Sequence, residues 1–245
     1  MIELNDVTFG YSKQNKLFNK LRLNLENSGI CGLLGKNGSG KTTLLKIIAG
    51  LIFSDEGNVR VFNHKPKNRT PTFLKEIYFL PEDFFTPALS VEQYQNFYAS
   101  FYPNFDHTFF NNALVEFDLP HHKLLTQFSY GQKKKFLIAF GLATNCSILI
   151  LDEPTNGLDI PSKTQFRKLL ASTISDKKLF LISTHQVHDI EKLIDTVVIL
   201  NEGKIIYHQP LIEENIRIDL EVLFNDVLAR DLNQNVTQGA THGHK

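Results

Sequence analysis

The sequence predicts an α/β fold with a mostly parallel sheet, an antiparallel β subdomain and an inserted helical subdomain. Three patterns carry this prediction: short apolar runs, a region of alternating apolar residues, and a long stretch of helical spacing. The apolar runs are typical of parallel strands that are covered on both faces. They lie at residues 30–34, 148–151, 179–182 and 197–200.

The alternating region comes first in the chain and predicts half-buried antiparallel strands. Apolar residues alternate at Ile2 and Leu4, and again at Leu21, Leu23 and Leu25. Because successive side chains of a strand point to opposite faces, this alternation places each set on one face of its strand. We therefore expect antiparallel strands at the start of the chain.

A glycine-rich loop follows the first apolar run. Residues 35–42 read Gly-Lys-Asn-Gly-Ser-Gly-Lys-Thr, and the apolar segment 44–49 that comes next suits a helix closed by Gly50. Strand, glycine loop and helix form the context in which a loop of this pattern binds nucleotide phosphates. The flanking strand and helix argue against the alternative, an ordinary glycine-rich turn.

The loop residues suit ATP with Mg²⁺. Glycines let the backbone turn tightly and aim successive N–H groups at phosphate oxygens, helped by the positive end of the following helix dipole. Lys41 is expected against the β- and γ-phosphates, and the Thr42 hydroxyl on Mg²⁺. The predicted ATP-binding residues of the loop are Gly35, Lys36, Asn37, Gly38, Ser39, Gly40, Lys41, Thr42 and Thr43.

Two neighbouring acids end the run 148–151. Asp152 falls at the carboxyl end of a predicted strand, where open α/β sheets place ligands, so its carboxylate is expected to reach the Mg²⁺ held by Thr42. Glu153 is placed to accept a proton from the water that attacks the γ-phosphate. Alone, the pair is more simply two solvated acids. Together with the glycine loop, it predicts a P-loop NTPase core that hydrolyses ATP.

Helical spacing dominates the insertion between about residues 84 and 145. Ser90 and Gln93 make a capping box, and apolar residues follow at helical spacing. Ten aromatic residues lie between Phe84 and Phe110. We expect most of them to form the core of this subdomain. The alternative is an aromatic groove beside Glu82 that receives a helix of a membrane partner.

With these motifs in this order, residues 1 to about 210 resemble the ATP-binding subunit of ATP-binding cassette (ABC) transporters. Tyr11 looks like the aromatic residue that stacks on adenine, and a core tyrosine at a strand end is the alternative. The segment 128–132 looks like the family signature, a loop that opens a helix. The resemblance implies that ATP held by the opposite subunit is bound there by Ser129, Gly131 and Gln132.

Two further stretches match the family. The segment 156–159 looks like the loop that crosses the dimer interface, and the resemblance makes Asp159 an ATP contact. His185 looks like the switch histidine that contacts the γ-phosphate; alone, a histidine at a strand end is usually structural. The segments 101–106 and 80–82 look like those of bacterial export-type members.

Two positions depart from the family pattern. Glu82 stands where the family usually has a glutamine in the loop that leads to the helical subdomain. Both side chains offer an oxygen to ATP-bound Mg²⁺ or water, but glutamate adds a negative charge and loses the amide donor. Tyr130 replaces the first of two signature glycines, and a side chain there could obstruct the approach to phosphate. We interpret the site as altered and still working.

The resemblance also implies a mechanism and partners. Two copies of the chain face each other head to tail, with two ATP molecules sandwiched between the phosphate loop of one and the signature of the other. Hydrolysis then separates them. A helical subdomain tethered at Glu82 passes this movement to a separate integral-membrane permease. The chain is therefore expected in the cytoplasm, peripheral on the inner face of the cell membrane.

The composition agrees with a cytoplasmic domain. Lys plus Arg and Asp plus Glu number 26 each, and this balance argues against a nucleic-acid partner. Cys31 and Cys146 lie beside apolar runs and are expected to be buried thiols in a reducing compartment. No apolar run approaches the roughly 18 residues of a membrane span. The amino terminus does not have the pattern of a signal peptide.

Residues 1–230 are expected to form the ATPase domain and the polar residues 231–245 a loose tail. Within the domain, the run Lys133 to Lys135 behind the signature is expected to be a solvated helix face.

Two other functions stay open. A soluble ABC ATPase that works in cofactor assembly or on nucleic acid needs no membrane partner, and the neutral charge weighs against the nucleic-acid version. A catalytically weak nucleotide-binding regulator is suggested by Tyr130 and Glu82. Membrane co-fractionation tests the first alternative, and measured ATP turnover tests the second.

Overall fold

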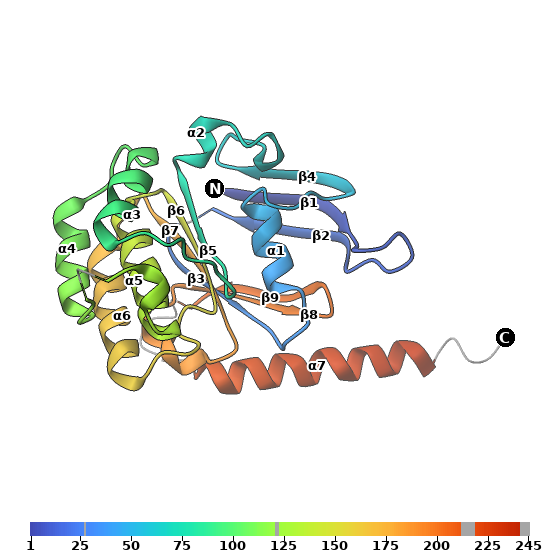
Figure 1. Cartoon of the computed structure of the whole chain (residues 1–245). Coiled ribbons are helices and arrows are strands. Elements are labelled where there is room, and N and C mark those ends of the chain that lie inside the picture. The colour runs from blue at the N-terminus through green and yellow to red at the C-terminus, as the bar shows by residue number, and fades with distance from the viewer. Residues whose placement is uncertain (27, 121–122, 212–218, 241–245) are drawn as a thin grey trace.

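Helix α1 lies between two β-sheets, and further helices cover the far face of the larger sheet (Figure 1). This computed structural model describes residues 1–26, 28–120, 123–211 and 219–240. The strands are β1 (Ile2–Phe9), β2 (Phe18–Leu25), β3 (Gly29–Leu34), β4 (Glu56–Val61), β5 (Ile77–Leu80), β6 (Ile148–Asp152), β7 (Leu179–Thr184), β8 (Thr196–Asn201) and β9 (Lys204–Pro210). The α-helices are α1 (Lys41–Ile48), α2 (Pro71–Leu74), α3 (Val91–Tyr98), α4 (His107–Glu116), α5 (Tyr130–Ala143), α6 (Ile160–Thr173) and α7 (Leu220–Ala240). Single-turn helices are η1 (Pro66–Asn68), η2 (Ala99–Phe101), η3 (Leu125–Gln127), η4 (Val187–Asp189) and η5 (Glu191–Leu193).

The two sheets have the predicted strand directions. The larger, six-stranded sheet has the order β5-β6-β7-β3-β8-β9 and is parallel except for β9, which pairs antiparallel with β8. The smaller sheet, β2-β1-β4, is antiparallel, and Leu4 pairs with Leu23 in it. The predicted α/β class, with a mostly parallel sheet and an antiparallel subdomain, is confirmed.

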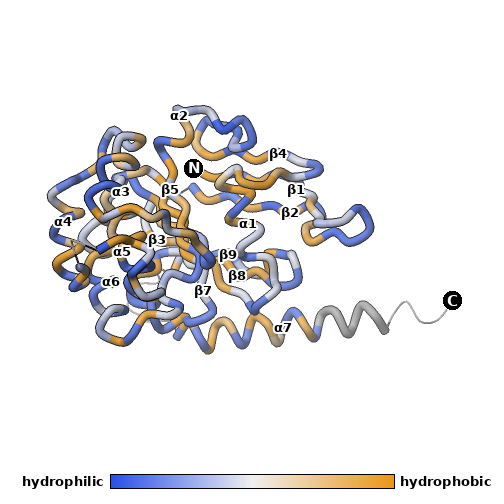
Figure 2. The backbone as a smooth tube through the Cα atoms, viewed as in Figure 1, coloured by the Kyte–Doolittle hydropathy of each residue, from blue (hydrophilic) through white to orange (hydrophobic). Residues whose placement is uncertain are grey.

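Alternate residues of the larger sheet enter two hydrophobic cores. In β6, Leu149 and Leu151 belong to the core formed with α3 to α6, whereas Ile148 and Ile150 belong to the core formed with α1 and the smaller sheet. A strand covered on both faces needs an uninterrupted apolar run, as this one has. Figure 2 shows apolar segments along the central strands and polar ones in the outer loops.

The elements between β5 and β6 are helical, as predicted. Helix α3 begins at the expected capping box, in which the Ser90 hydroxyl accepts from the Gln93 N–H at 3.1 Å and the Gln93 side chain accepts from the Ser90 N–H at 2.9 Å. Of the aromatic residues expected in this core, Phe85, Phe97 and Phe101 are exposed, and the others are buried in the core or pack against it. The subdomain therefore has its own aromatic core and leaves some rings on the surface.

The last helix extends further than expected. Helix α7 continues to Ala240, so residues 231–240 are helical where we predicted a loose tail, and 241–245 lie outside the described residues. Its first half is attached to the body through buried Leu220 and Val227. Proline is absent from this segment, and polar residues such as glutamine tolerate a helix well.

Both cysteines are buried, as predicted, and burial raises the pKa of the Cys31 and Cys146 thiols to about 12. Among the described residues, none of the helices combines the length and the apolar character that crossing a membrane requires.

Candidate active site

The glycine-rich loop joins the carboxyl end of β3 to the first turn of α1. Gly40 has a φ of 108°, in a backbone region that other residues rarely adopt. Gly35 leaves no room for a side chain, because a Cβ there would lie 2.5 Å from the Leu200 carbonyl oxygen. The Gly203 N–H also donates to the Ser39 carbonyl at 3.1 Å. The loop is thus folded tightly against the hairpin of β8 and β9.

The Lys41 side chain lies inside this loop. It is only 7% exposed, and its ammonium donates to the Gly35 carbonyl at 2.8 Å and the Lys36 carbonyl at 3.3 Å. The ammonium also lies 3.7 Å from the Glu153 carboxylate. Its charge therefore stands beside the positive end of α1, where a phosphate group is favoured.

Thr42 and Asp152 come together from α1 and the end of β6. The Thr42 hydroxyl donates to Asp152 Oδ2 at 2.7 Å, and the Ser183 hydroxyl donates to Oδ1 at 2.5 Å. Hydroxyl and carboxylate oxygens are ligands that Mg²⁺ prefers, with water and phosphate oxygens completing its shell. The described residues hold no group of three or more His, Cys, Asp or Glu placed around a metal. The Thr42 hydroxyl and the Asp152 carboxylate are of the ligand types that fit Mg²⁺.

The Glu153 carboxylate is enclosed between two nitrogen groups. Its side chain is 6% exposed, and Oε1 lies 2.9 Å from Nδ1 of His185 and 3.7 Å from Nζ of Lys41. The Glu153 N–H donates to the Ser183 hydroxyl at 3.0 Å. Three residues that the sequence pointed to separately, at the start of α1 and just after β6 and β7, thus meet at one point.

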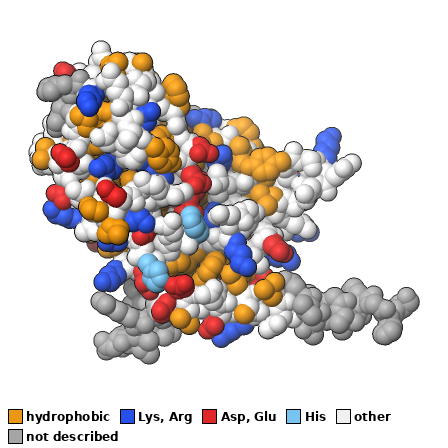
Figure 3. Space-filling model, turned by 60° about the horizontal axis from the view of Figure 1, so that its bottom comes forward, with side chains coloured by type: hydrophobic (Ala, Val, Ile, Leu, Met, Phe, Trp, Pro, Cys, Tyr) orange, Lys and Arg blue, Asp and Glu red, His pale blue; other side chains and the backbone are white. Residues whose placement is uncertain are grey.

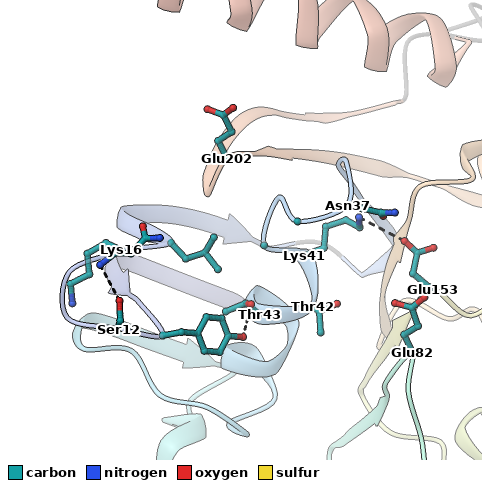
Figure 4. Close-up of a pocket in the computed structure, with 14 residues that line it drawn as sticks. Ser12, Lys16, Asn37, Lys41, Thr42, Thr43, Glu82, Glu153 and Glu202 are labelled. Atoms are coloured by element: carbon teal, nitrogen blue, oxygen red, sulfur yellow. Dashed lines mark hydrogen bonds and ion pairs between the residues drawn. The ribbon is translucent and has the colours of Figure 1, made fainter.

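A cavity of about 630 Å³ opens onto Lys41 and Glu153, whereas His185 and Asp152 are not among the residues that line it. Its volume lies in the range of small-molecule sites. Figure 4 shows Glu82 and Glu153 together at one end, Ser12 and Lys16 at the other, and Glu202 on the β8–β9 hairpin. The lining residues are Tyr11, Ser12, Asn15, Lys16, Leu17, Asn37, Gly38, Gly40, Lys41, Thr42, Thr43, Glu82, Glu153 and Glu202.

Tyr11 is exposed at the cavity. Its residue surface is 72% accessible, and its hydroxyl lies 2.9 Å from the Thr43 hydroxyl. The alternative of a buried core tyrosine is therefore wrong. An accessible ring at the cavity wall is free to stack on a flat ligand.

The helical part and the strand-rich part of the molecule meet on the outer surface. Acidic side chains gather at the boundary between the helical half and the strand-rich half, beside a histidine, and α7 crosses this face below them (Figure 3).

The signature residues and Asp159 lie outside this cavity. Ser129 caps α5 in a second capping box, in which its hydroxyl accepts from the Gln132 N–H at 3.3 Å and its own N–H donates to the Gln132 side chain at 3.0 Å. Gly131 lies between these two residues in the sequence. Ser129, Gly131 and Gln132 are not among the residues that line the cavity. Asp159 caps α6, and its hydrogen bonds with Ser162 lower the pKa of this carboxyl. These predicted ATP contacts are not brought to the chain's own cavity.

The two departures from the family pattern touch each other. The Tyr130 hydroxyl donates to the Glu82 carbonyl at 3.1 Å, and its ring stacks on Phe84 with centroids 5.2 Å apart. The ring also covers Gly157, where an added Cβ would lie 2.8 Å from it. The Glu82 carboxylate accepts from the Asn156 side chain at 2.9 Å. Tyr130 therefore packs against loops of its own chain.

The lysine run behind the signature is not the solvated face that we predicted. Lys134 is completely buried, and Lys135 is partly buried and donates to the Phe117 carbonyl at 2.9 Å. Successive residues of an α-helix point about 100° apart, so three consecutive lysines do not share one face.

Sequence reasoning missed several residues of this site. Ser183 contacts both Asp152 and Glu153, and its position at the end of a predicted strand was a usable signal. The polar residues that follow Tyr11 and the hairpin residue Glu202 also line the cavity. No motif marks these positions.

Comparison with known proteins identifies the family. The family described as "ABC transporter" matches residues 18–156. The chain belongs to the ABC transporter family. Its relatives include the bacitracin transport ATP-binding protein BcrA of Bacillus licheniformis, 32% identical over 214 residues that cover 86% of this chain and 70% of that protein. The ABC transporter ATP-binding protein NatA of Bacillus subtilis is 28% identical over 249 residues, which cover 95% of this chain and all of that protein.

Solved structures share the fold. An ATP-binding subunit of an ABC transporter matches with a TM-score of 0.81 at 22% identity, over 93% of this chain and 99% of that one. An ATP-binding cassette dimer in a post-hydrolysis state with ADP and phosphate matches with a TM-score of 0.73 at 23% identity, over 87% of this chain and all of that one. This ABC protein is thus an ATP-binding, ATP-hydrolysing subunit of the transporter type.

Proposed function

We propose that this ABC ATPase powers a separate integral-membrane permease through ATP-driven closure of a head-to-tail dimer. The observation that carries the proposal is the division of the predicted ATP contacts into two separate sets. Lys41, Thr42 and Glu153 line the cavity, whereas the signature lies outside it at the start of α5. A second copy that faces the first head to tail supplies its signature to ATP in this cavity. A bacterial ABC transporter cassette with the same fold has a dimeric structure, which supports the proposal of a dimer.

Within the cavity, the residues of one chain bind and orient ATP. Tyr11 stacks on the adenine, the loop N–H groups hold the phosphates, and Lys41 faces the β- and γ-phosphates. Mg²⁺, when bound by Thr42 and Asp152 with Glu82 beside them, neutralises charge on the phosphate oxygens.

Two residues act at the γ-phosphate end. Glu153 takes the proton of the attacking water, a general-base role worth about 10² to 10⁴ in rate. His185 lies 2.9 Å from the Glu153 carboxylate, where it orients that group and contacts the γ-phosphate. From the partner, Ser129, Gly131, Gln132 and Asp159 complete the site.

The helical subdomain carries closure to the permease. Glu82 follows β5, at the start of the subdomain, and touches α5 through Tyr130. Within the same subdomain, Phe85 and Phe97 are 86% and 58% exposed and offer apolar surface to a membrane partner. We place the protein in the cytoplasm, on the inner face of the cell membrane.

Dimer closure is tested by light scattering on the Glu153→Gln variant, in which ATP is bound and not consumed. We expect the mass to double on addition of Mg-ATP and to stay monomeric with Mg-ADP. In the same background, Ser129→Arg is expected to prevent doubling, because a large charged side chain at the cap of α5 obstructs the opposing phosphate. A monomer under every condition would contradict the proposed dimer.

The membrane partner is tested by fractionation of cells that express the tagged wild-type chain. We expect the chain in the membrane fraction, together with one multi-span protein after crosslinking. A soluble ABC ATPase, the competing function, stays in the soluble fraction at the same expression level.

Replacing Tyr130 with glycine is expected to change ATP turnover by less than about threefold. The ring packs on Phe84 and Gly157 of its own chain, so the opposing γ-phosphate keeps its place at Ser129. The measurement is steady-state hydrolysis at saturating Mg-ATP and at concentrations that give dimers. Tyr130→Phe, which loses only the hydrogen bond to Glu82, is the matched control. A tenfold acceleration of the glycine variant, about 1.4 kcal/mol of barrier, would show that the ring crowds the phosphate.

A further inference from the structure

A buried lysine lies directly behind the proposed general base. Lys134 lies in the second turn of α5, has no exposed surface, and is among the largest fully buried side chains of the described residues. Lysine is almost never fully buried unless its ammonium has partners, because removing a charge from water is costly. The contacts of this ammonium therefore indicate what the residue does.

The ammonium binds the backbone of the loop that follows β6. It donates to the Glu153 carbonyl at 2.5 Å and to the Asn156 carbonyl at 3.0 Å. Glu153 has a φ of 48°, in the left-handed region that a residue other than glycine occupies only when its surroundings hold it there. Lys134 binds the carbonyl of this strained residue and a second carbonyl three residues on. Lys134 thus holds the backbone of this loop in place through two hydrogen bonds.

The surroundings balance the buried charge. Burial lowers the pKa of the Lys134 ammonium, and the carboxylates of Glu82, Glu153, Asp152 and Asp83 act in the opposite direction. The Tyr130 ring, one helical turn earlier, lies 5.6 Å from the ammonium and adds a cation–π contact. The unusual signature tyrosine therefore covers the lysine.

We propose that Lys134 is a positioning residue for ATP hydrolysis, which fixes the backbone at Glu153 so that its carboxylate stays aimed at the attacking water. This inference rests on the proposed role of Glu153. Lys134 itself does not line the cavity, so it acts through the loop and not on ATP.

The same contact joins the two ATP sites of the proposed dimer. Ser129 caps α5 and faces the partner's ATP, and five residues later the same helix binds the loop that carries this chain's own Glu153. One helix therefore contacts both the partner's proposed ATP site and the loop of this chain's proposed general base.

Lys134→Met tests the proposal, because it keeps the length of the apolar stem and removes the donors. We expect kcat to fall by roughly tenfold or more, since small misplacements of a catalytic group are costly, and KM for Mg-ATP to change by less than about threefold. Lys135→Met is the matched control. That lysine also donates to a backbone carbonyl, but to that of Phe117 at the end of α4, so kcat should stay within about twofold.

A double-mutant cycle separates positioning from mere support of the fold. In the Glu153→Gln background the group to be positioned is gone, so Lys134→Met is expected to cause no further loss of the residual rate. A structural role predicts the same fold-loss in both backgrounds. Lys134→Gln keeps N–H donors of its own and is expected to retain more activity than the methionine variant. If the methionine variant does not fold, Lys134→Gln takes its place in the experiment.

Two results would overturn the proposal: a folded Lys134→Met or Lys134→Gln protein with kcat within about threefold of wild type, or equal losses in the two backgrounds. A wrong assignment of Glu153 as the general base would be recognised separately. In that case Glu153→Gln alone would hydrolyse ATP at near wild-type rate.

Discussion

Replacing Glu153 with glutamine is expected to slow ATP hydrolysis by roughly 10² or more while ATP still binds. Glutamine keeps the size and the hydrogen-bonding ability of the side chain but cannot take a proton from water. The backbone bond to Ser183 is unaffected, so the loop keeps its shape. Because ATP is bound and not consumed, closed dimers should accumulate. The measurements are steady-state turnover and the Kd for Mg-ATP by calorimetry.

Glu202→Gln is the matched control for this experiment. Glu202 also lines the cavity, but it lies on the β8–β9 hairpin and makes no contact with Asp152 or His185 among the described interactions. We expect its turnover to stay near that of the wild type. Near wild-type turnover in Glu153→Gln would remove Glu153 from the role of general base.

Several site residues that sequence reasoning identified share one property. The residues near the phosphate loop belong to short motifs at or just after the ends of apolar runs, as Lys41 and Thr42 do after β3 and Asp152 does at the end of β6. The carboxyl ends of parallel strands lie at the same edge of a sheet. Motifs that follow these strands therefore come close together, and this does not depend on how the connecting segments fold. The strand β7 lies between β3 and β6 and completes this edge with Ser183.

Contacts that depend on how a helix is turned could not be predicted in this way. Lys134 faces the loop after β6 because Phe136 and Phe140 of the same helix are buried in the aromatic core. That orientation comes from packing among residues distant in sequence, and a run of three lysines gives no sign of it. The same holds for Tyr130, whose ring direction is set by Phe84 and Glu82.

Helix α7 was missed for a different reason. Its apolar residues are widely spaced, and its polar second half resembles a tail in composition. Few apolar contacts are needed to anchor one end of a helix, and no proline interrupts the segment that continues it. Composition alone therefore underestimates how far a terminal helix extends.

Replacing Lys41 with alanine is expected to abolish both ATP-dependent dimer formation and turnover. The ammonium donates to two carbonyls of the loop and lies 3.7 Å from Glu153, so it supplies positive charge at the point where we propose that the γ-phosphate binds. Without it, the phosphates lose a charge-assisted partner and Glu153 faces them unopposed. The effect on Kd for Mg-ATP is measured by calorimetry, and dimer formation by light scattering.

Lys46→Ala provides the control for a general effect of removing a lysine from this helix. Lys46 lies in the last turn of α1, outside the cavity, and we expect the variant to bind and hydrolyse ATP as the wild type does. The fold of Lys41→Ala should be retained, because the loop glycines and the Thr42 contact to Asp152 remain. A far-ultraviolet circular dichroism spectrum like that of the wild type would show that the overall secondary structure is kept. If Lys41→Ala binds Mg-ATP with unchanged affinity, the ammonium does not touch the phosphates. The phosphate site would then depend on the loop N–H groups and the α1 dipole alone, and Lys41 would serve only to hold the loop carbonyls.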